Sequence, residues 1–153
     1  MKGLAGAMVT CLALYFTVAV PAFAKSPTID TAFHNSVDIA GFRSCSWREG
    51  RPAANRQTEE TIRAQVETQL EDKGYALVAS GADCLVMTQA VRDRHLPVGM
   101  LVVDVYDKAS GDLAWRGVAT AMAKSDPKEV QKLVVKTIKK MFKQFPEARA
   151  GQL

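Results

Sequence analysis

The chain has few of the side chains that carry enzyme chemistry. It contains two histidines, His34 and His95, and three cysteines, and it has no G-x-S-x-G, C-x-x-C or H-x-x-x-H spacing. A nucleophilic triad needs a serine or cysteine beside a base and an orienting acid. A zinc site needs closely spaced nitrogen and sulfur ligands. We therefore predict no catalytic residue, no metal site and no cofactor.

Carboxylates are the remaining candidates for acid–base work. Asp107 and Asp112 flank Gly111, and aspartates at such turns ordinarily bond to the local backbone. Asp104 alternates with valines, so we expect it to face solvent or a polar edge. A carboxylate-based hydrolytic enzyme stays the alternative function. It would require a deep polar pocket that brings Asp83 or Asp104 to a histidine.

The chain also lacks a strong excess of charge. Twenty basic and 16 acidic residues give a net charge of +4 among 153 residues. Nucleic-acid-binding proteins usually carry a much larger basic excess. We therefore expect no nucleic-acid partner.

The N-terminus has the pattern of a targeting segment. Lys2 precedes an uncharged apolar run over residues 3–20. Small residues, Ala22 and Ala24, occupy positions −3 and −1 relative to a cleavage site before Lys25. This pattern predicts a signal peptide over residues 1–24, cleaved between Ala24 and Lys25, and a periplasmic or secreted protein. After cleavage the chain would not be an integral membrane protein.

This segment has two alternative fates. The apolar run approaches the length of a membrane-spanning helix, so an uncleaved anchor is one alternative. Lipid attachment at Cys11 is the other, but Met8-Val9-Thr10 fits a lipobox poorly. Cleavage is favoured over both.

Cleavage leaves residues 25–153, which the length prior assigns to a single domain. Cys45 and Cys84 then remain, and two thiols in an oxidising compartment predict one disulfide. Two separate buried thiols are the rival interpretation.

Hydrophobic periodicity divides this domain into strands and two helices. Strand patterns occur at 28–34, 41–47, 75–79, 83–91, 100–107 and 113–123, with the third and fourth forming one strand or two. Helical patterns occur at 58–73 and 127–145. We predict an α+β fold: a two-layer sandwich with a mostly antiparallel sheet of about five strands and both helices on one face.

The second helix carries the most distinctive surface. Asp126 is its expected N-cap and Pro127 its first residue. Its polar arc consists of Lys128, Lys132, Lys136, Lys139, Lys140 and Lys143. Such a face can bind an anionic lipid head group or an acidic envelope protein, or it can be solvated only. The first helix instead gathers Glu60, Glu67 and Glu71, so the helical layer should be electrically asymmetric.

Trp115 and Arg116 are adjacent in the sequence "LAWRGVA" and could suggest an aromatic–cation platform. Neighbouring strand residues point to opposite faces. We therefore expect Trp115 in the core and Arg116 in solvent.

Several segments together resemble the bacterial envelope family called domain of unknown function 4136. They are "FRSCSW", "KGY" after a helix, "ADCLVM", "LVVDVYDKASGDLAWRGVA" and "KKMFKQFP". The resemblance implies an exported protein, often a lipoprotein, whose molecular role is not established. The family commonly has an aromatic residue where Cys45 stands, so a Cys45–Cys84 bridge would be a local feature. We expect a non-enzymatic binding or interaction module.

Overall fold

The structure is a computed structural model that describes residues 26–92, 98–122 and 124–150. The predicted signal peptide, its cleavage site between Ala24 and Lys25, Cys11 and His95 lie outside the described residues. The strands are β1 (Thr28–Phe33), β2 (Ser44–Trp47), β3 (Ala76–Leu77), β4 (Cys84–Arg92), β5 (Val98–Asp107) and β6 (Leu113–Met122). The helices are α1 (Arg56–Asp72) and α2 (Pro127–Met141), with short 3-10 turns at Ile39–Gly41 and Phe142–Gln144.

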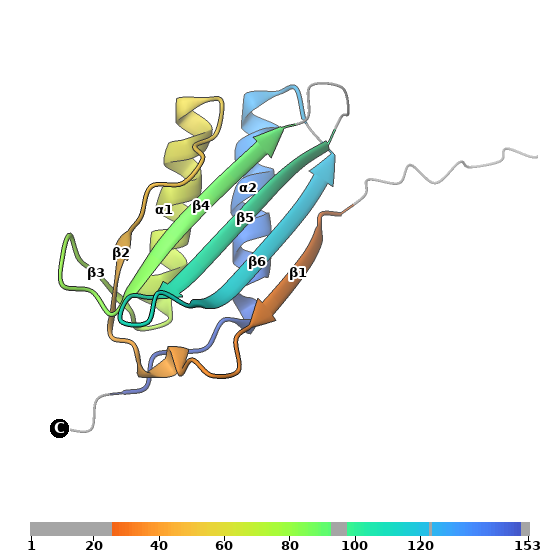
Figure 1. Cartoon of the computed structure of the whole chain (residues 1–153). Helices are drawn as coiled ribbons and strands as arrows, with labels where there is room; N and C mark the ends of the chain where they lie inside the picture. The colour runs from red at the N-terminus through yellow and green to blue at the C-terminus, as the bar shows by residue number, and fades with distance from the viewer. Residues whose placement is uncertain (1–25, 93–97, 123, 151–153) are drawn as a thin grey trace, which may run out of the picture.

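The six strands form one sheet in the order β1-β6-β5-β4-β2-β3. Strands β1, β6, β5 and β4 pair antiparallel, whereas β2 runs parallel to both β4 and β3. Both helices lie side by side on one face of this sheet (Figure 1). The predicted two-layer α+β sandwich is confirmed, with six strands because Ala76–Leu77 pairs separately from β4. The parallel pairs follow from α1, which carries the chain back across the sheet after β2.

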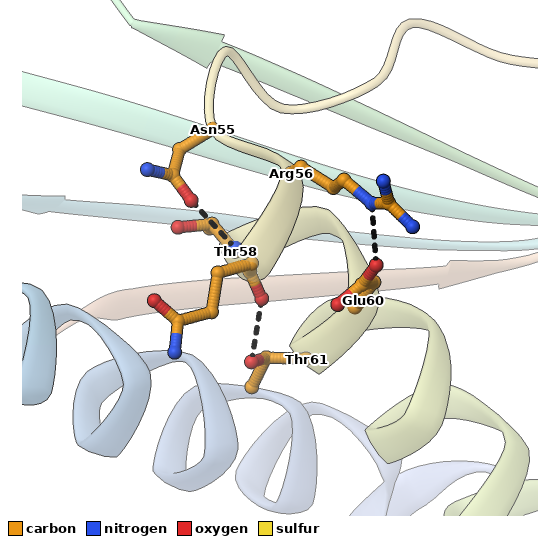
Figure 2. A network of polar contacts seen from close by, with 6 residues as sticks. Asn55, Arg56, Thr58, Glu60 and Thr61 are labelled. Carbon is orange, nitrogen blue, oxygen red and sulfur yellow. Dashed lines mark hydrogen bonds and ion pairs between the residues drawn. The ribbon is translucent and has the colours of Figure 1, made fainter.

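Side-chain capping sets where each helix begins. The N–H of Thr58 donates to Asn55 Oδ1 at 3.1 Å, so α1 starts at Arg56 and not at the predicted Thr58 (Figure 2). The N–H of Lys128 donates to Asp126 Oδ1 at 2.7 Å, and Pro127 is the first residue of α2, as expected. Helix α2 ends at Met141, four residues before the predicted boundary, because the chain tightens into a 3-10 turn.

Large side chains fill one end of the space between sheet and helices. The Trp115 ring packs against Phe142 and Phe145 with centroid separations of 5.2 and 5.0 Å, and Tyr75 meets Phe145 edge-on at 5.5 Å. All four rings are almost fully buried. Trp115 is therefore a core residue, as expected, and the aromatic cluster marks the helix-facing side of β6.

Gly117, the next helix-facing residue of β6, leaves room for α2. A Cβ at this position would lie 2.5 Å from Met141 Sδ and 2.6 Å from the Trp115 ring. A side chain there would therefore force α2 away from the sheet or displace the tryptophan.

Candidate functional site

The six predicted lysines of the second helix share one exposed surface. Lys128, Lys132, Lys136, Lys139, Lys140 and Lys143 are all exposed, and among the described residues none forms an ion pair or a side-chain hydrogen bond. Ile138 and Met141, on the opposite side of the helix, are fully buried against the core. We call these six residues the lysine face. It includes a shallow depression around half-buried Val135.

The lysine face has an energetic cost. Lys128, Lys132, Lys136 and Lys140 follow one another at intervals of four residues, and so do Lys139 and Lys143. Each like-charged pair at this spacing destabilises a helix by about 0.2–0.5 kcal/mol. Lys143 lies in the 3-10 turn after α2, so three such pairs lie within the helix and together cost it roughly 0.6–1.5 kcal/mol.

The predicted acidic surface of α1, formed by Glu60, Glu67 and Glu71, is only partly exposed. Glu60 is exposed and accepts a hydrogen bond from Arg56 Nε at 2.8 Å (Figure 2). Glu71 is also exposed. Glu67 is half-buried instead, because the indole N–H of Trp47 donates to its Oε1 at 2.7 Å.

Cys45 and Cys84 are joined by a disulfide in the structure. They are direct partners on the parallel strands β2 and β4, with a Cα–Cα distance of 4.5 Å, and both are fully buried. The bond ties β2 to the antiparallel part of the sheet. Buried and bonded, these sulfurs cannot serve as metal ligands.

Asp104 and Arg116 form an ion pair, and the expectation that Asp104 faces solvent or a polar edge was wrong. Arg116 lies on the sheet face opposite Trp115, as expected, and its side chain is 43% exposed although it is paired. Asp104 is completely buried, and the Nε and Nη2 groups of Arg116 donate to its two carboxylate oxygens at 2.7 and 2.8 Å. The two residues are cross-strand partners on the sheet face away from the helices. The hydrogen bond to Asp104 raises the pKa of Arg116 above its usual range.

Tyr106 completes this cluster on the outer face. Its hydroxyl donates to Asp104 Oδ2 at 3.3 Å, and the Arg48 guanidinium lies 5.3 Å from its ring centroid. Burial and the nearby Asp104 raise the pKa of Tyr106. The Asp104 carboxylate is thus held by neighbouring side chains and is not presented to a substrate.

The other candidates for acid–base chemistry lie apart. His34 is exposed just after β1, with its Nδ1 at 2.8 Å from the Ser36 hydroxyl. Asp83 Oδ2 accepts hydrogen bonds from the backbone N–H groups of Arg43 and Ser44. Over residues 26–92, 98–122 and 124–150, no three metal-ligating side chains come together. None of the described helices has the length and apolar character needed to cross a bilayer.

An open cleft lies between sheet and helices at the end opposite the aromatic cluster. Leu101 is an exception, but most of the other helix-facing residues of β4, β5 and β6 are small there: Ala90, Gly99, Ala119 and Ala121. Because these residues cannot reach the helices, a space of about 1070 Å³ remains beside the first turns of α1 and α2. Asn55 and Thr58, whose capping hydrogen bond is drawn in Figure 2, are among the residues that line this space. The alternation Gly117-x-Ala119-x-Ala121 is the sequence signal that could have indicated it.

Residues 29–147 match the family model described as Domain of unknown function (DUF4136). The chain belongs to this family. The match covers every strand and both helices, and none of the curated proteins matches the sequence.

Solved structures share the fold at low sequence identity. A PelC dodecamer from Paraburkholderia phytofirmans has a TM-score of 0.54 at 12% identity, with coverage of 81% of this chain and 99% of that chain. A PDZ domain protein from Parabacteroides distasonis has a TM-score of 0.63 at 14% identity, with coverage of 82% of this chain and 37% of that chain. At these identities the similarity establishes a common fold only.

Proposed function

We propose that this DUF4136 member is a non-enzymatic binding module of the bacterial cell envelope that holds an anionic component through the lysine face. The component is an anionic lipid head group or an acidic envelope protein. The predicted signal peptide at residues 1–24 supports export, to the periplasm or beyond the cell.

The observation that carries the proposal is that none of the six lysines forms an ion pair with an acidic side chain in the described part of the chain. On α1, by contrast, Arg56 is paired with Glu60. The single acidic residue of α2, Glu129, makes its loose contact of 3.8 Å with Lys124 and not with the lysine face. An anionic partner would remove the repulsion between the lysines.

The enzyme alternative has less support from the arrangement of side chains. Asp104 is occupied by Arg116, and Asp83 by two backbone N–H groups. His34 is exposed, and among the described residues its ring is hydrogen-bonded only to the Ser36 hydroxyl, so neither carboxylate is placed to share a proton with it.

Vesicle co-sedimentation tests the proposal directly. Each lysine near an anionic membrane contributes about 1 kcal/mol, so Lys132→Gln, Lys136→Gln and Lys139→Gln together should weaken binding to phosphatidylglycerol vesicles by over a hundredfold. Raising the salt concentration should also release the wild type, because the Debye length is about 10 Å at 0.1 M and shortens further.

A matched control variant removes the same number of positive charges from surfaces outside the lysine face. Arg43→Gln, Arg56→Gln and Lys108→Gln remove three exposed positive charges outside α2 and should leave vesicle binding within about twofold. If the vesicles bind nothing, crosslinking in the native envelope should capture an acidic protein in a manner that depends on Lys132, Lys136 and Lys139. Binding that ignores both salt and these lysines would contradict the proposal.

A further inference from the structure

The cleft between sheet and helices has apolar walls on both sides. Ala90, Leu101, Ala119 and Ala121 line it from the sheet, and Ile62, Val130, Leu133 and Val134 line it from the helices. Its volume of about 1070 Å³ is at the upper end of the range for small-molecule sites, which are typically about 300–1,000 Å³. Close packing fills the same layer around Trp115, so the space is confined to one end of the molecule.

The charged residues that line the cleft all have the same sign. They are Arg51, Arg92 and Lys124, and no acidic side chain among the described residues lines it. They come from the segment before α1, the end of β4 and the segment before α2, which meet at the same end of the molecule (Figure 1). Lys124 makes a loose contact of 3.8 Å with Glu129 and stays about half exposed. The mouth of the cleft is therefore cationic.

We propose that the cleft binds a single-chain anionic amphiphile, with its alkyl chain between the alanine-lined sheet and α2 and its acidic group at the mouth beside Arg51, Arg92 and Lys124. The apolar walls select the chain, and the uniform positive charge selects the acidic group. This site is separate from the lysine face, which lies on the outer side of α2 away from the sheet.

A chain-length series tests the apolar part. Displacement of 11-(dansylamino)undecanoate from the purified protein would be measured with octanoate, decanoate and dodecanoate below their micelle concentrations. Burying one methylene contributes about 0.8 kcal/mol, so affinity should rise about three- to fourfold per methylene and roughly a hundredfold from octanoate to dodecanoate. Absence of saturable binding, or affinity that does not depend on chain length, would overturn the proposal.

Two pairs of substitutions test the location. Ala90→Leu with Ala121→Leu fills the cleft from the sheet side and should weaken dodecanoate binding by more than tenfold while the melting temperature is retained. If that variant does not fold, Val130→Phe fills the cleft from α2 and should have the same effect. Arg51→Gln with Lys124→Gln should weaken decanoate binding about three- to tenfold, as expected for exposed charges, and leave 1-decanol binding unchanged.

The lysine-face variant described above separates this proposal from the proposed function. Replacing Lys132, Lys136 and Lys139 by glutamine should abolish vesicle binding and leave decanoate affinity within about twofold. If filling the cleft has no effect on binding, or if 1-decanol binds as tightly as decanoate, the cleft is not a site for an anionic amphiphile, whatever the vesicles show.

Discussion

Breaking the Asp104–Arg116 ion pair should lower the unfolding free energy by more than the loss of an ordinary surface ion pair would, although the pair lies on the outer face of the sheet. Arg116→Met leaves the carboxylate of Asp104, which is 0% exposed, without its cation. Removing one partner of a buried ion pair typically costs about 3–5 kcal/mol. The Arg116 side chain is 43% exposed, so water screens the pair and we expect about 2–3 kcal/mol of lost unfolding free energy.

Replacing Asp104 should destabilise the protein less than replacing Arg116, because an unpaired Arg116 can turn to solvent. Asp104→Asn should cost about 1 kcal/mol, and the double variant should be only slightly worse than Asp104→Asn. The double-mutant cycle should therefore give a coupling of about 2 kcal/mol. Urea denaturation followed by the fluorescence of Trp47 and Trp115 measures each term.

A neighbouring arginine provides the control for this cycle. Arg48 lies over the ring of Tyr106 but makes no hydrogen bond to Asp104, so Arg48→Met should cost less than about 1 kcal/mol. If the single substitutions at Asp104 and Arg116 add within about 0.5 kcal/mol, the pair is not coupled and our interpretation of it is wrong.

Three further changes follow from the core. Reducing the Cys45–Cys84 disulfide, which closes a loop with a sequence separation of 39, should lower the unfolding free energy by about 4 kcal/mol in urea titrations with and without reductant; equal midpoints would refute this. Gly117→Ala should lower the unfolding free energy by about 1–3 kcal/mol, because the added methyl group overpacks against Met141. The melting temperature should fall accordingly, and an unchanged melting temperature would show that α2 moves to make room for the methyl group. Burial is the main cause that raises the pKa of Tyr75 to about 12, and the negative charge of Asp38 adds to it. The protonated Tyr75 therefore contributes its full stability below about pH 10, and this contribution is lost between about pH 10 and 12. Tyr75→Phe should flatten this alkaline decline, and an identical decline in both proteins would exclude Tyr75 as its source.

The boundaries of helices and turns were predictable from the sequence where a few neighbouring residues define them. The Asp126-Pro127 pair fixed the start of α2, and Gly111, with φ of 79°, occupies the turn that joins β5 to β6. The predicted start of α1 lies two residues too late, because the periodic pattern does not reveal that the side chain of Asn55 caps the helix.

The Asp104–Arg116 pair could not be predicted because it depends on register. The pairing of β5 with β6 shifts by one residue between Val105 and Tyr106. Without this irregularity Asp104 would stand opposite Trp115, and its carboxylate would have no cation across the strand. Alternation correctly separated Trp115 from Arg116, but it contains no information about a bulge.

The cleft was missed for a different reason. Ala90, Gly99, Ala119 and Ala121 are ordinary residues when each strand is considered alone. Only the assembled sheet places them next to one another and under the first turns of the helices. The small residues Gly117, Ala119 and Ala121 suggest a thin face on one strand, but a space of this kind is a property of several strands together.

The uneven filling of the helix–sheet layer also affects how the molecule fluctuates. At one end the cross-strand pair Val105–Trp115 is locked under aromatic rings, whereas at the other end Leu101–Ala119 borders open space. Local opening is easiest where few apolar contacts must be broken. Amide protons of Leu101 and Ala119 should therefore exchange with deuterium faster than those of Val105 and Trp115 on the same two strands. The aromatic end would then act as a fixed hinge, and the alanine end could open to admit a guest molecule while the sheet stays folded.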